Sequence, residues 1–115
     1  MRATWTNVDE SELLQRSSHN VAVLGSKIYV FAGELKPRQP RDNDIFVLDT
    51  GDEEPIAATA TFVASVESRR PSPRVGSAVA KLGNKLYFFS GRGGEAMAAV
   101  NEQGVLWVFD TVETT

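Results

Sequence analysis

The chain has no cysteine among its 115 residues, so a disulfide framework and thiolate chemistry are excluded. Histidine is nearly absent too, because His19 is the single one. A catalytic metal needs three or four convergent ligands, and the sequence assembles no such set around His19. We therefore expect His19 to be a hydrogen-bonded structural residue rather than a ligand or a base.

Long apolar runs and an excess of positive charge are also missing. No segment approaches the roughly 20 apolar residues that a membrane helix needs. Residues 1–15 lack the apolar middle of a signal peptide. The net charge of −3 does not indicate a nucleic-acid partner. We expect no membrane and no nucleic acid among the partners, and we expect a cytoplasmic location.

What the chain does contain is an internal repeat. Residues 16–50 return at 74–111, with matching residues about 58 positions apart in one register. The matched pairs are Arg16/Arg74, Gly25/Gly83, Lys27/Lys85, Tyr29/Tyr87, Phe31/Phe89 and Gly33/Gly91. Asp49-Thr50 then matches Asp110-Thr111 at about 61, so the second copy has roughly three extra residues before its last strand.

The repeated stretches predict an all-β fold of antiparallel strands. Gly25-Ser26 and Gly83-Asn84 fit two-residue hairpin turns, between runs rich in β-branched and aromatic residues. The expected strands are 3–8, 20–24, 27–32, 45–48 and 57–66, then a second hairpin at 77–90 and a strand at 105–109. The expected loops are 33–43, 91–94 and 9–15, where two adjacent leucines leave a helical turn as the alternative. The alternating aromatic residues are expected to pack sheets: Tyr29, Phe31, Tyr87, Phe89, Trp107 and Phe109.

The second copy ends without a fourth strand, and the chain begins with a strand that belongs to no sheet. Trp5 precedes Arg16 by nearly the same distance as Phe62 precedes Arg74. We therefore divide the chain into three segments. Residues 1–8 form a strand that completes a neighbouring unit, 16–66 form a complete unit, and 74–111 form a unit of three strands whose fourth comes from another chain or segment.

Four-stranded units of roughly 50 residues resemble the kelch repeats of β-propellers. The motifs that carry the resemblance are KIYVFAG and KLYFFSG, an arginine upstream of each, DIFVLDT and VLWVFDT downstream, and Trp5 in the fourth-strand position. The double glycine of kelch repeats is Ala32-Gly33 and Ser90-Gly91 here. The resemblance implies two kelch-type four-stranded antiparallel blades, part of a six-bladed propeller.

Among kelch proteins the chain is most similar to the plant specifier proteins (epithiospecifier, nitrile-specifier and thiocyanate-forming proteins). The similarity is carried by the stretch 16–50 with its GE…PR…DN loop, by PRVG at 73–76 and by Gly91-Arg92. Specifier proteins redirect glucosinolate breakdown with ferrous iron, held by a Glu, an Asp and a His spaced four residues apart. No such triplet stands in this sequence. We assign no catalytic residue, no metal ligand and no cofactor. Fe²⁺ is expected as a cofactor only if the function is specifier-like.

The candidate ligand-binding residues are Glu34, Arg38, Arg41 and Arg92, which follow the second strand of each hairpin. In kelch propellers these loops open on one face around the central channel. Arginines there can clamp a sulfate or a carboxylate in bidentate geometry. Alternatively, these arginines are solvated charges, or they pair with Glu34, Asp42 and Asp44.

Two blades cannot close a ring, and three hypotheses follow. The chain is a protomer of a homotrimer with six blades, in which each Trp5 strand completes the sheet of its neighbour; or it is part of a longer propeller; or it is a monomeric pair of sheets. For function, the first hypothesis is a non-enzymatic interaction module that binds a protein or a small anionic ligand. The alternative is a specifier-like protein, or a part of one, that acts on glucosinolate aglycones to give nitriles.

Overall fold

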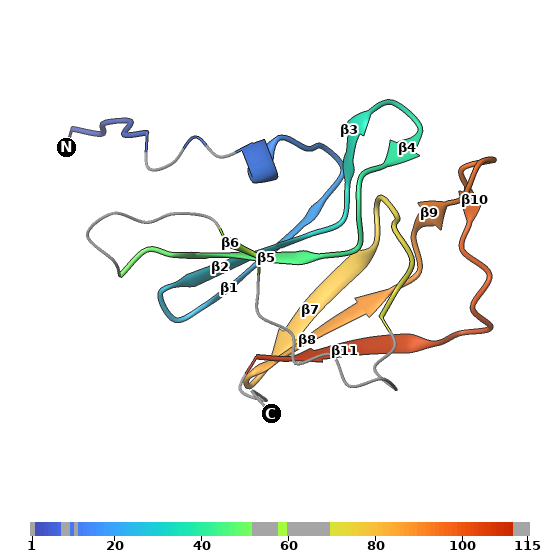
Figure 1. Cartoon of the computed structure of the whole chain (residues 1–115). Helices are drawn as coiled ribbons and strands as arrows, with labels where there is room; N and C mark the ends of the chain where they lie inside the picture. The colour runs from blue at the N-terminus through green and yellow to red at the C-terminus, as the bar shows by residue number, and fades with distance from the viewer. Residues whose placement is uncertain (1, 8–9, 11, 52–57, 60–69, 112–115) are drawn as a thin grey trace.

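The computed structural model describes residues 2–7, 10, 12–51, 58–59 and 70–111, and this part of the chain is all-β apart from one turn of 3-10 helix, η1 (Glu12–Leu14) (Figure 1). The strands of the first half are β1 (Asn20–Leu24), β2 (Lys27–Phe31), β3 (Glu34–Lys36), β4 (Gln39–Pro40), β5 (Ile45–Asp49) and β6 (Ala58–Thr59). The strands of the second half are β7 (Ala78–Leu82), β8 (Lys85–Phe89), β9 (Arg92–Gly93), β10 (Ala98–Ala99) and β11 (Leu106–Asp110).

The predicted repeat is confirmed as two antiparallel sheets of the same strand order. The first sheet has the order β1-β2-β5-β6 and the second the order β11-β8-β7, so β7, β8 and β11 repeat β1, β2 and β5. Each hairpin turns at a glycine with positive φ, 61° at Gly25 and 60° at Gly83. The register is also repeated, because Phe31 pairs with Ile45 and Phe89 pairs with Leu106.

The prediction of loops at 33–43 and 91–94 is wrong in part, because each segment contributes to a short two-stranded ribbon. β3 pairs with β4, with an irregular register between Glu34 and Lys36, and β9 pairs with β10. Both ribbons stand at the same end of the two sheets (Figure 1). Strands of two or three residues are too short to show an alternating pattern, which is why the sequence does not reveal them.

The N-terminal segment also differs from the expectation. The favoured loop at 9–15 gives way to its alternative, because Glu12–Leu14 form a helical turn, with Gln15 N donating to Glu12 O at 3.1 Å. Residues 2–7 form no strand and run away from the sheets, and Trp5 is fully exposed (Figure 1). Their predicted partner is a sheet of another chain or segment, so that pairing stays a prediction. Of the strand expected at 57–66, β6 pairs with β5, and the rest lies outside the described residues.

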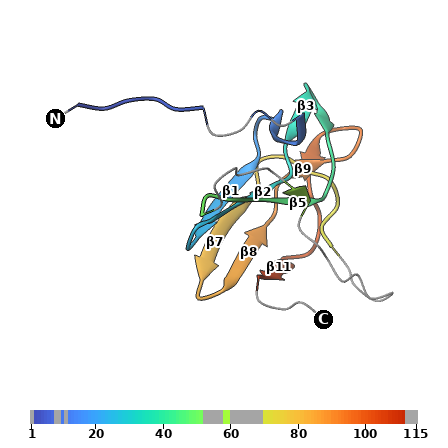
Figure 2. The ribbon, with the colours of Figure 1, turned by 60° about the vertical axis from the view of Figure 1, so that its left-hand side comes forward.

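The core lies between the two sheets, where aromatic side chains meet. Phe31 and Phe88 contact each other with ring centroids 4.8 Å apart, and Tyr29 meets the ring of Phe109 edge-on at 6.1 Å. Leu86 is fully buried in the same cluster. Figure 2 shows β1 and β7 side by side, with the remaining strands fanning out from this contact. The two units are therefore one packed body.

Backbone and side-chain hydrogen bonds also join the units. Gly33 N donates to Arg74 O at 2.9 Å, and Gly76 N donates to Ser18 O at 3.0 Å. Lys81 Nζ, at the opposite end of the sheets, donates to Val23 O at 3.0 Å. Because buried polar backbone groups are costly to leave unpaired, these bonds fix how one sheet sits on the other.

Candidate functional site

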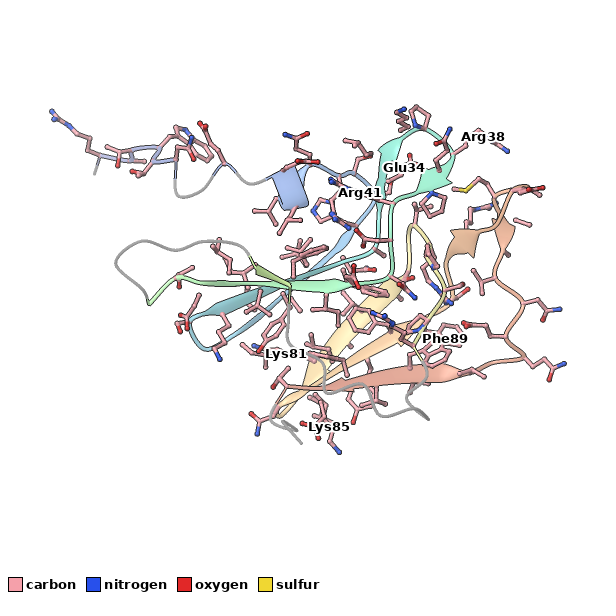
Figure 3. All side chains as sticks on the ribbon, viewed as in Figure 1. Glu34, Arg38, Arg41, Lys81, Lys85 and Phe89 are labelled. Atoms are coloured by element: carbon pink, nitrogen blue, oxygen red, sulfur yellow. The ribbon has the colours of Figure 1, made fainter. Side chains whose placement is uncertain are left out.

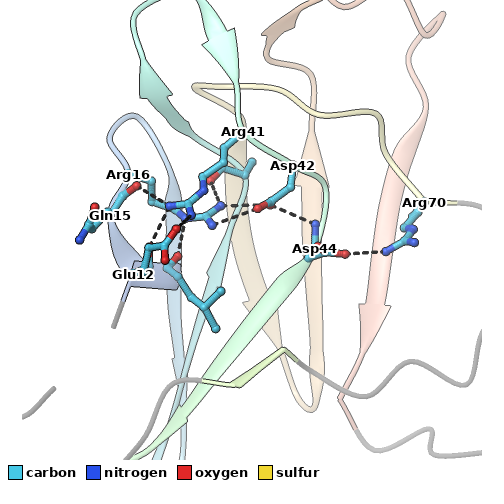
Figure 4. Close-up of polar contacts among 9 residues, drawn as sticks. Glu12, Gln15, Arg16, Arg41, Asp42, Asp44 and Arg70 are labelled. Carbon is cyan, nitrogen blue, oxygen red and sulfur yellow. Dashed lines mark hydrogen bonds and ion pairs between the residues drawn. The ribbon is translucent and has the colours of Figure 1, made fainter. Parts of the chain in front are cut away.

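An arginine is buried at the same position of both units. The Arg16 side chain is 0% exposed, and its two terminal nitrogens donate to the two carboxylate oxygens of Asp42 at 3.1 Å each (Figure 4). The Arg74 side chain is 1% exposed and donates to the two oxygens of Glu102 at 2.7 and 2.8 Å. Such bidentate pairs are among the strong hydrogen bonds of proteins. Each unit therefore has one internal ion pair.

The same two arginines also bind the backbone at the end of the second strand. Arg16 Nη1 donates to Ala32 O at 2.8 Å, and Arg74 Nη1 donates to Ser90 O at 3.0 Å. Ala32 and Ser90 have φ values of 64° and 63°, which cost a residue with a side chain roughly 1–2 kcal/mol. The hydrogen bonds from the arginines hold these residues in the conformation. Ala32 and Ser90, which replace the first glycine of the kelch double glycine, therefore occupy a position with a strained backbone.

Both ion pairs belong to the fold and leave no charge free for a ligand. The Arg74 guanidinium holds the pKa of Glu102 below its ordinary value, and the indole N–H of Trp107, 2.8 Å from Glu102 Oε2, adds to the shift. In the first unit the Arg16 guanidinium lies over the Phe46 ring, 4.7 Å from its centroid. We conclude that these pairs stabilise the loops that carry the candidate site.

Arg41, one of the predicted ligand-binding residues, is occupied by contacts within the chain. Its Nη1 donates to the carbonyl oxygens of Glu12 and Gln15 at 2.8 and 2.9 Å, and its Nη2 lies 3.4 Å from the Glu12 carboxylate (Figure 4). Arg41 therefore holds the helical turn η1 in place. This contact also explains why residues 12–14 form the helical turn rather than the loop that the sequence favours.

Arg38 and Arg92 lie on different ribbons, and the two ribbons stand at the same end of the molecule. We call this surface the ribbon end, and it comprises residues 34–40 and 92–99. Arg38 projects from the β3–β4 turn (Figure 3), and its Nη2 is 3.4 Å from Ala96 O on the other ribbon. Arg92 is exposed on β9, and its guanidinium has no hydrogen bond to any residue that the structure describes. Glu34 Oε2 accepts the backbone N–H of Arg38 at 2.8 Å and so fixes the turn.

Of the two alternatives for these arginines, solvated charges fit the exposed Arg38 and Arg92, whereas ion pairs with Glu34, Asp42 and Asp44 are not formed. Asp42 accepts from Arg16, and Asp44 accepts from Arg70 at 2.9 Å (Figure 4). Glu34 meets Arg38 through the backbone rather than through an ion pair. The ribbon end thus keeps two guanidinium groups without a carboxylate partner in the described part of the chain.

Other chemistry finds little support in the described residues. No group of three His, Asp or Glu side chains within 2–7, 10, 12–51, 58–59 and 70–111 is arranged to hold a metal ion. His19 is exposed and makes no hydrogen bond to described residues, contrary to the expected role. A hollow of about 190 Å³ lies beside Phe89 and the 100–105 loop, below the roughly 300 Å³ of ordinary small-molecule sites. No helix in this part of the chain is long and apolar enough to cross a membrane.

Sequence reasoning missed the structural role of Arg16 and Arg74. The signal was present, because both arginines hold the same repeat position while many residues around them differ. Each also has an acidic residue at a similar distance downstream, Asp42 and Glu102. A charge that recurs in two units of one fold, with an acid that recurs beside it, indicates an ion pair inside each unit.

Comparison with known proteins gives two partial similarities. No family model matches the chain. Over 79 residues it is 40% identical to the N-(sulfonatooxy)prop-2-enimidothioate sulfolyase of Thlaspi arvense, a match that covers 67% of this chain and 21% of that protein. Over 113 aligned positions it is 31% identical to host cell factor 2 of Homo sapiens, a match that covers 85% of this chain and 14% of that protein. The chain thus spans about a fifth or less of the length of either relative. Together they suggest a kelch-type repeat.

Proposed function

We propose that the chain is an interaction module built of two kelch-type β-propeller blades, which binds an anionic group at its ribbon end. Three observations support this proposal. The two sheets repeat one strand order and pack on each other. Both ribbons carry an arginine at the same end. The sequence is similar to two curated proteins that suggest a kelch-type repeat.

One observation carries the choice of site. Arg38 and Arg92 come from equivalent ribbons of different units, and neither guanidinium has a carboxylate partner among the described residues. The Arg38 contact to Ala96 O is long at 3.4 Å, so a stronger acceptor readily replaces it. A planar guanidinium donates two parallel hydrogen bonds to sulfate or carboxylate. A small anion or an acidic side chain of a partner protein is the expected ligand of these guanidinium groups.

The test is a calorimetric titration of the chain with sulfate. We expect Arg38→Met combined with Arg92→Met to weaken sulfate binding at least about tenfold, since each charge-assisted hydrogen bond contributes on the order of 1.5–3 kcal/mol. Lys85→Met is the matched control, because Lys85 is an exposed cation at the far end of the second sheet (Figure 3). Equal binding by the double variant and the control would disprove this site.

A second function rests on the 40% identity to a protein whose name describes a sulfolyase acting on an N-(sulfonatooxy)prop-2-enimidothioate. In this alternative the chain, or a longer protein that contains it, acts on glucosinolate aglycones with Fe²⁺. The described residues do not form a site for iron, so we derive no step through the metal. Nitrile formation by the chain with added Fe²⁺, and none without it, would favour this alternative over a binding module.

We further propose that the unit 74–111 is completed from outside, by the N-terminal segment of another copy or by further blades. β11 is an edge strand of its sheet in the described part of the chain, whereas its counterpart β5 pairs with β6. Trp5 is fully exposed and available for such pairing. Native mass spectrometry tests the trimer: we expect a species near three times 12.5 kDa that disappears when residues 1–8 are deleted. A trimer that survives the deletion would rule out strand exchange.

A further inference from the structure

One exposed serine stands between two prolines at the entrance to the second unit. Ser72 lies in the segment 70–73, which forms no strand, with Pro71 before it and Pro73 after it. A proline favours an extended backbone in the residue that precedes it, so Pro73 favours an extended Ser72. Ser72 is also the only serine or threonine of the sequence that precedes a proline. Proline-directed protein kinases accept this pattern, since their cleft binds an extended segment and needs no acceptor for the N–H that proline lacks.

The Ser72 hydroxyl already contacts a buried cation. Arg74 Nη2 donates to Ser72 Oγ at 3.1 Å, and Arg74 Nε donates to Ser72 O at 3.0 Å. A hydroxyl oxygen has two lone pairs and one proton. The contact with Arg74 uses one lone pair, and the hydroxyl donates to no residue that the structure describes. The second lone pair and the proton therefore remain available for a reaction.

The first unit shows that the fold does not need this hydroxyl. The position that matches Ser72 is Leu14, at the same offset of about 58 that relates Arg16 to Arg74. Without a hydroxyl, Arg16 still pairs with both oxygens of its carboxylate and still binds the carbonyl at the end of the second strand. The two units share the arginine but not the hydroxyl beside it. Ser72 therefore serves something other than the shared fold.

Arg74 has no donor left for a further anion. Its five N–H groups bind Ser90 O, both carboxylate oxygens of Glu102, and the carbonyl and hydroxyl oxygens of Ser72. Nη2 binds both Ser72 Oγ and Glu102 Oε2, at 3.1 and 2.8 Å, so these two oxygens are neighbours. A phosphate on Ser72 carries a charge of about −1.5 to −2. The phosphate and the Glu102 carboxylate would then share one guanidinium and repel each other.

We propose that Ser72 is a phosphorylation site for a proline-directed protein kinase, and that its phosphate displaces Glu102 from Arg74. In the reaction Ser72 Oγ attacks the γ-phosphorus of ATP, and the bond from that phosphorus to the bridging oxygen of the β-phosphate breaks. ADP leaves, and the hydroxyl proton passes to a base of the kinase. The phosphate oxygens accept more strongly than the hydroxyl and bind Nη2. Glu102, whose side chain is 18% exposed, turns toward solvent.

Displacement of Glu102 changes the surroundings of Trp107. Glu102 Oε2 accepts the Trp107 indole N–H at 2.8 Å and so joins the 100–105 loop to β11. When Glu102 turns away, the indole N–H loses this acceptor and the loop loses its link to the sheet. Phosphorylation of Ser72 thus loosens one loop of the second unit. This site does not depend on anion binding at the ribbon end, so either can be absent without the other.

The first test is incubation of the full chain with a proline-directed protein kinase and Mg-ATP, followed by mass spectrometry of the intact chain and of its peptides. We expect one phosphate, on Ser72, and none on the Ser72→Ala or Pro73→Ala chain. Pro71→Ala is the matched control, because it changes the proline on the other side of the same serine and should leave phosphorylation intact. Circular dichroism verifies that each variant folds. No phosphate on the wild-type chain, or equal phosphorylation of Pro73→Ala, overturns the site.

The second test follows the two indole N–H groups by NMR before and after phosphorylation. Exchange of the Trp107 indole N–H with water should accelerate at least about tenfold, since hydrogen bonds to charged groups protect by that factor or more. Trp5 is fully exposed and serves as the internal reference, whose exchange stays unchanged. In the Glu102→Gln chain the neutral amide is not repelled, so phosphorylation should leave Trp107 exchange as it was. Unchanged exchange of Trp107 in the phosphorylated wild-type chain overturns the displacement of Glu102.

Discussion

Replacement of Arg74 by methionine isolates the energy of the buried ion pair in the second unit. Arg74→Met keeps the length and the apolar stem of the side chain, but removes every hydrogen bond that the guanidinium donates. The bonds lost are those to both oxygens of Glu102, to Ser90 O, and to the carbonyl and hydroxyl of Ser72. Glu102 then keeps its negative charge with only the Trp107 indole N–H beside it.

The expected cost is large on the scale of the whole fold. Removing one partner of a buried ion pair costs about 3–5 kcal/mol, because the remaining charge stays buried without compensation. Natural domains of this size are stable by roughly 5–15 kcal/mol in total. Arg74→Met therefore removes at least about a fifth of the stability. Adding Glu102→Leu removes the stranded charge, and we expect the double variant to regain a large part of the loss.

Urea unfolding followed by circular dichroism measures these free energies. The control is Arg70→Met, which breaks an ion pair with Asp44 whose side chains are 49% and 38% exposed. Exposed pairs contribute about 0–1 kcal/mol, so the control should unfold close to the wild-type midpoint. A loss below about 1 kcal/mol for Arg74→Met, or a double variant less stable than the single one, would refute the reasoning.

Three further predictions concern the core, a close approach of the backbone at Gly33 and the pH dependence of stability. Phe88→Ala removes a ring from between the sheets, and urea unfolding should show a loss of about 3–5 kcal/mol. Gly33→Ala places a Cβ 2.7 Å from a backbone oxygen at a φ of 92°, whereas Gly25→Ala meets nothing within 4 Å; thermal unfolding should show the larger loss for Gly33, with Gly25 limited to about 1–2 kcal/mol. Because Arg74 lowers the pKa of Glu102, that pair stabilises the fold above pH 4.5 and loses its effect as pH falls through the lowered pKa. Glu102→Gln should reduce this loss of stability at acid pH. A loss as large as that of the wild type would contradict the assigned role of the pair.

The sheets could be predicted from the sequence because their signals are local. Lys27–Phe31 and Lys85–Phe89 alternate β-branched and aromatic residues, and a glycine with positive φ sits in each turn. The repeat adds information that one hairpin alone does not have. Because the same residue types return in one register, it predicts the same strand order and the same pairing for both units.

The candidate site was less predictable, because tertiary contacts decide which arginines are free. Arg38, Arg41 and Arg92 look alike in sequence, as basic residues in loops after a second strand. Only the fold places Glu12 and Gln15 beside Arg41 and so removes it from the ribbon end. The pairing of Asp42 with Arg16 was signalled only by the repeat, in which an arginine and a downstream acidic residue recur at similar spacing.

The aromatic residues of the two sheets show the same limit of prediction from sequence. Tyr29 and Phe31 pack between the sheets as expected, while Phe89 stands 45% exposed at the equivalent position. Identical residues in identical register thus have opposite environments. The alternating pattern identifies a face that needs a partner, but it does not state whether this chain supplies one.

The hydrogen bonds from Gly33 N to Arg74 O and from Gly76 N to Ser18 O have a consequence for amide exchange with deuterated water. Both amides lie outside regular strands, where exchange is ordinarily fast, yet both donate across the contact between the units. Their protection factors therefore report how often one sheet lifts off the other while each stays folded. The Gly91 amide, equivalent to Gly33, exchanges rapidly in a lone chain and slows only when something docks against its sheet. Two of these glycine amides thus report separation of the sheets, and the third reports docking against the second sheet, in one experiment.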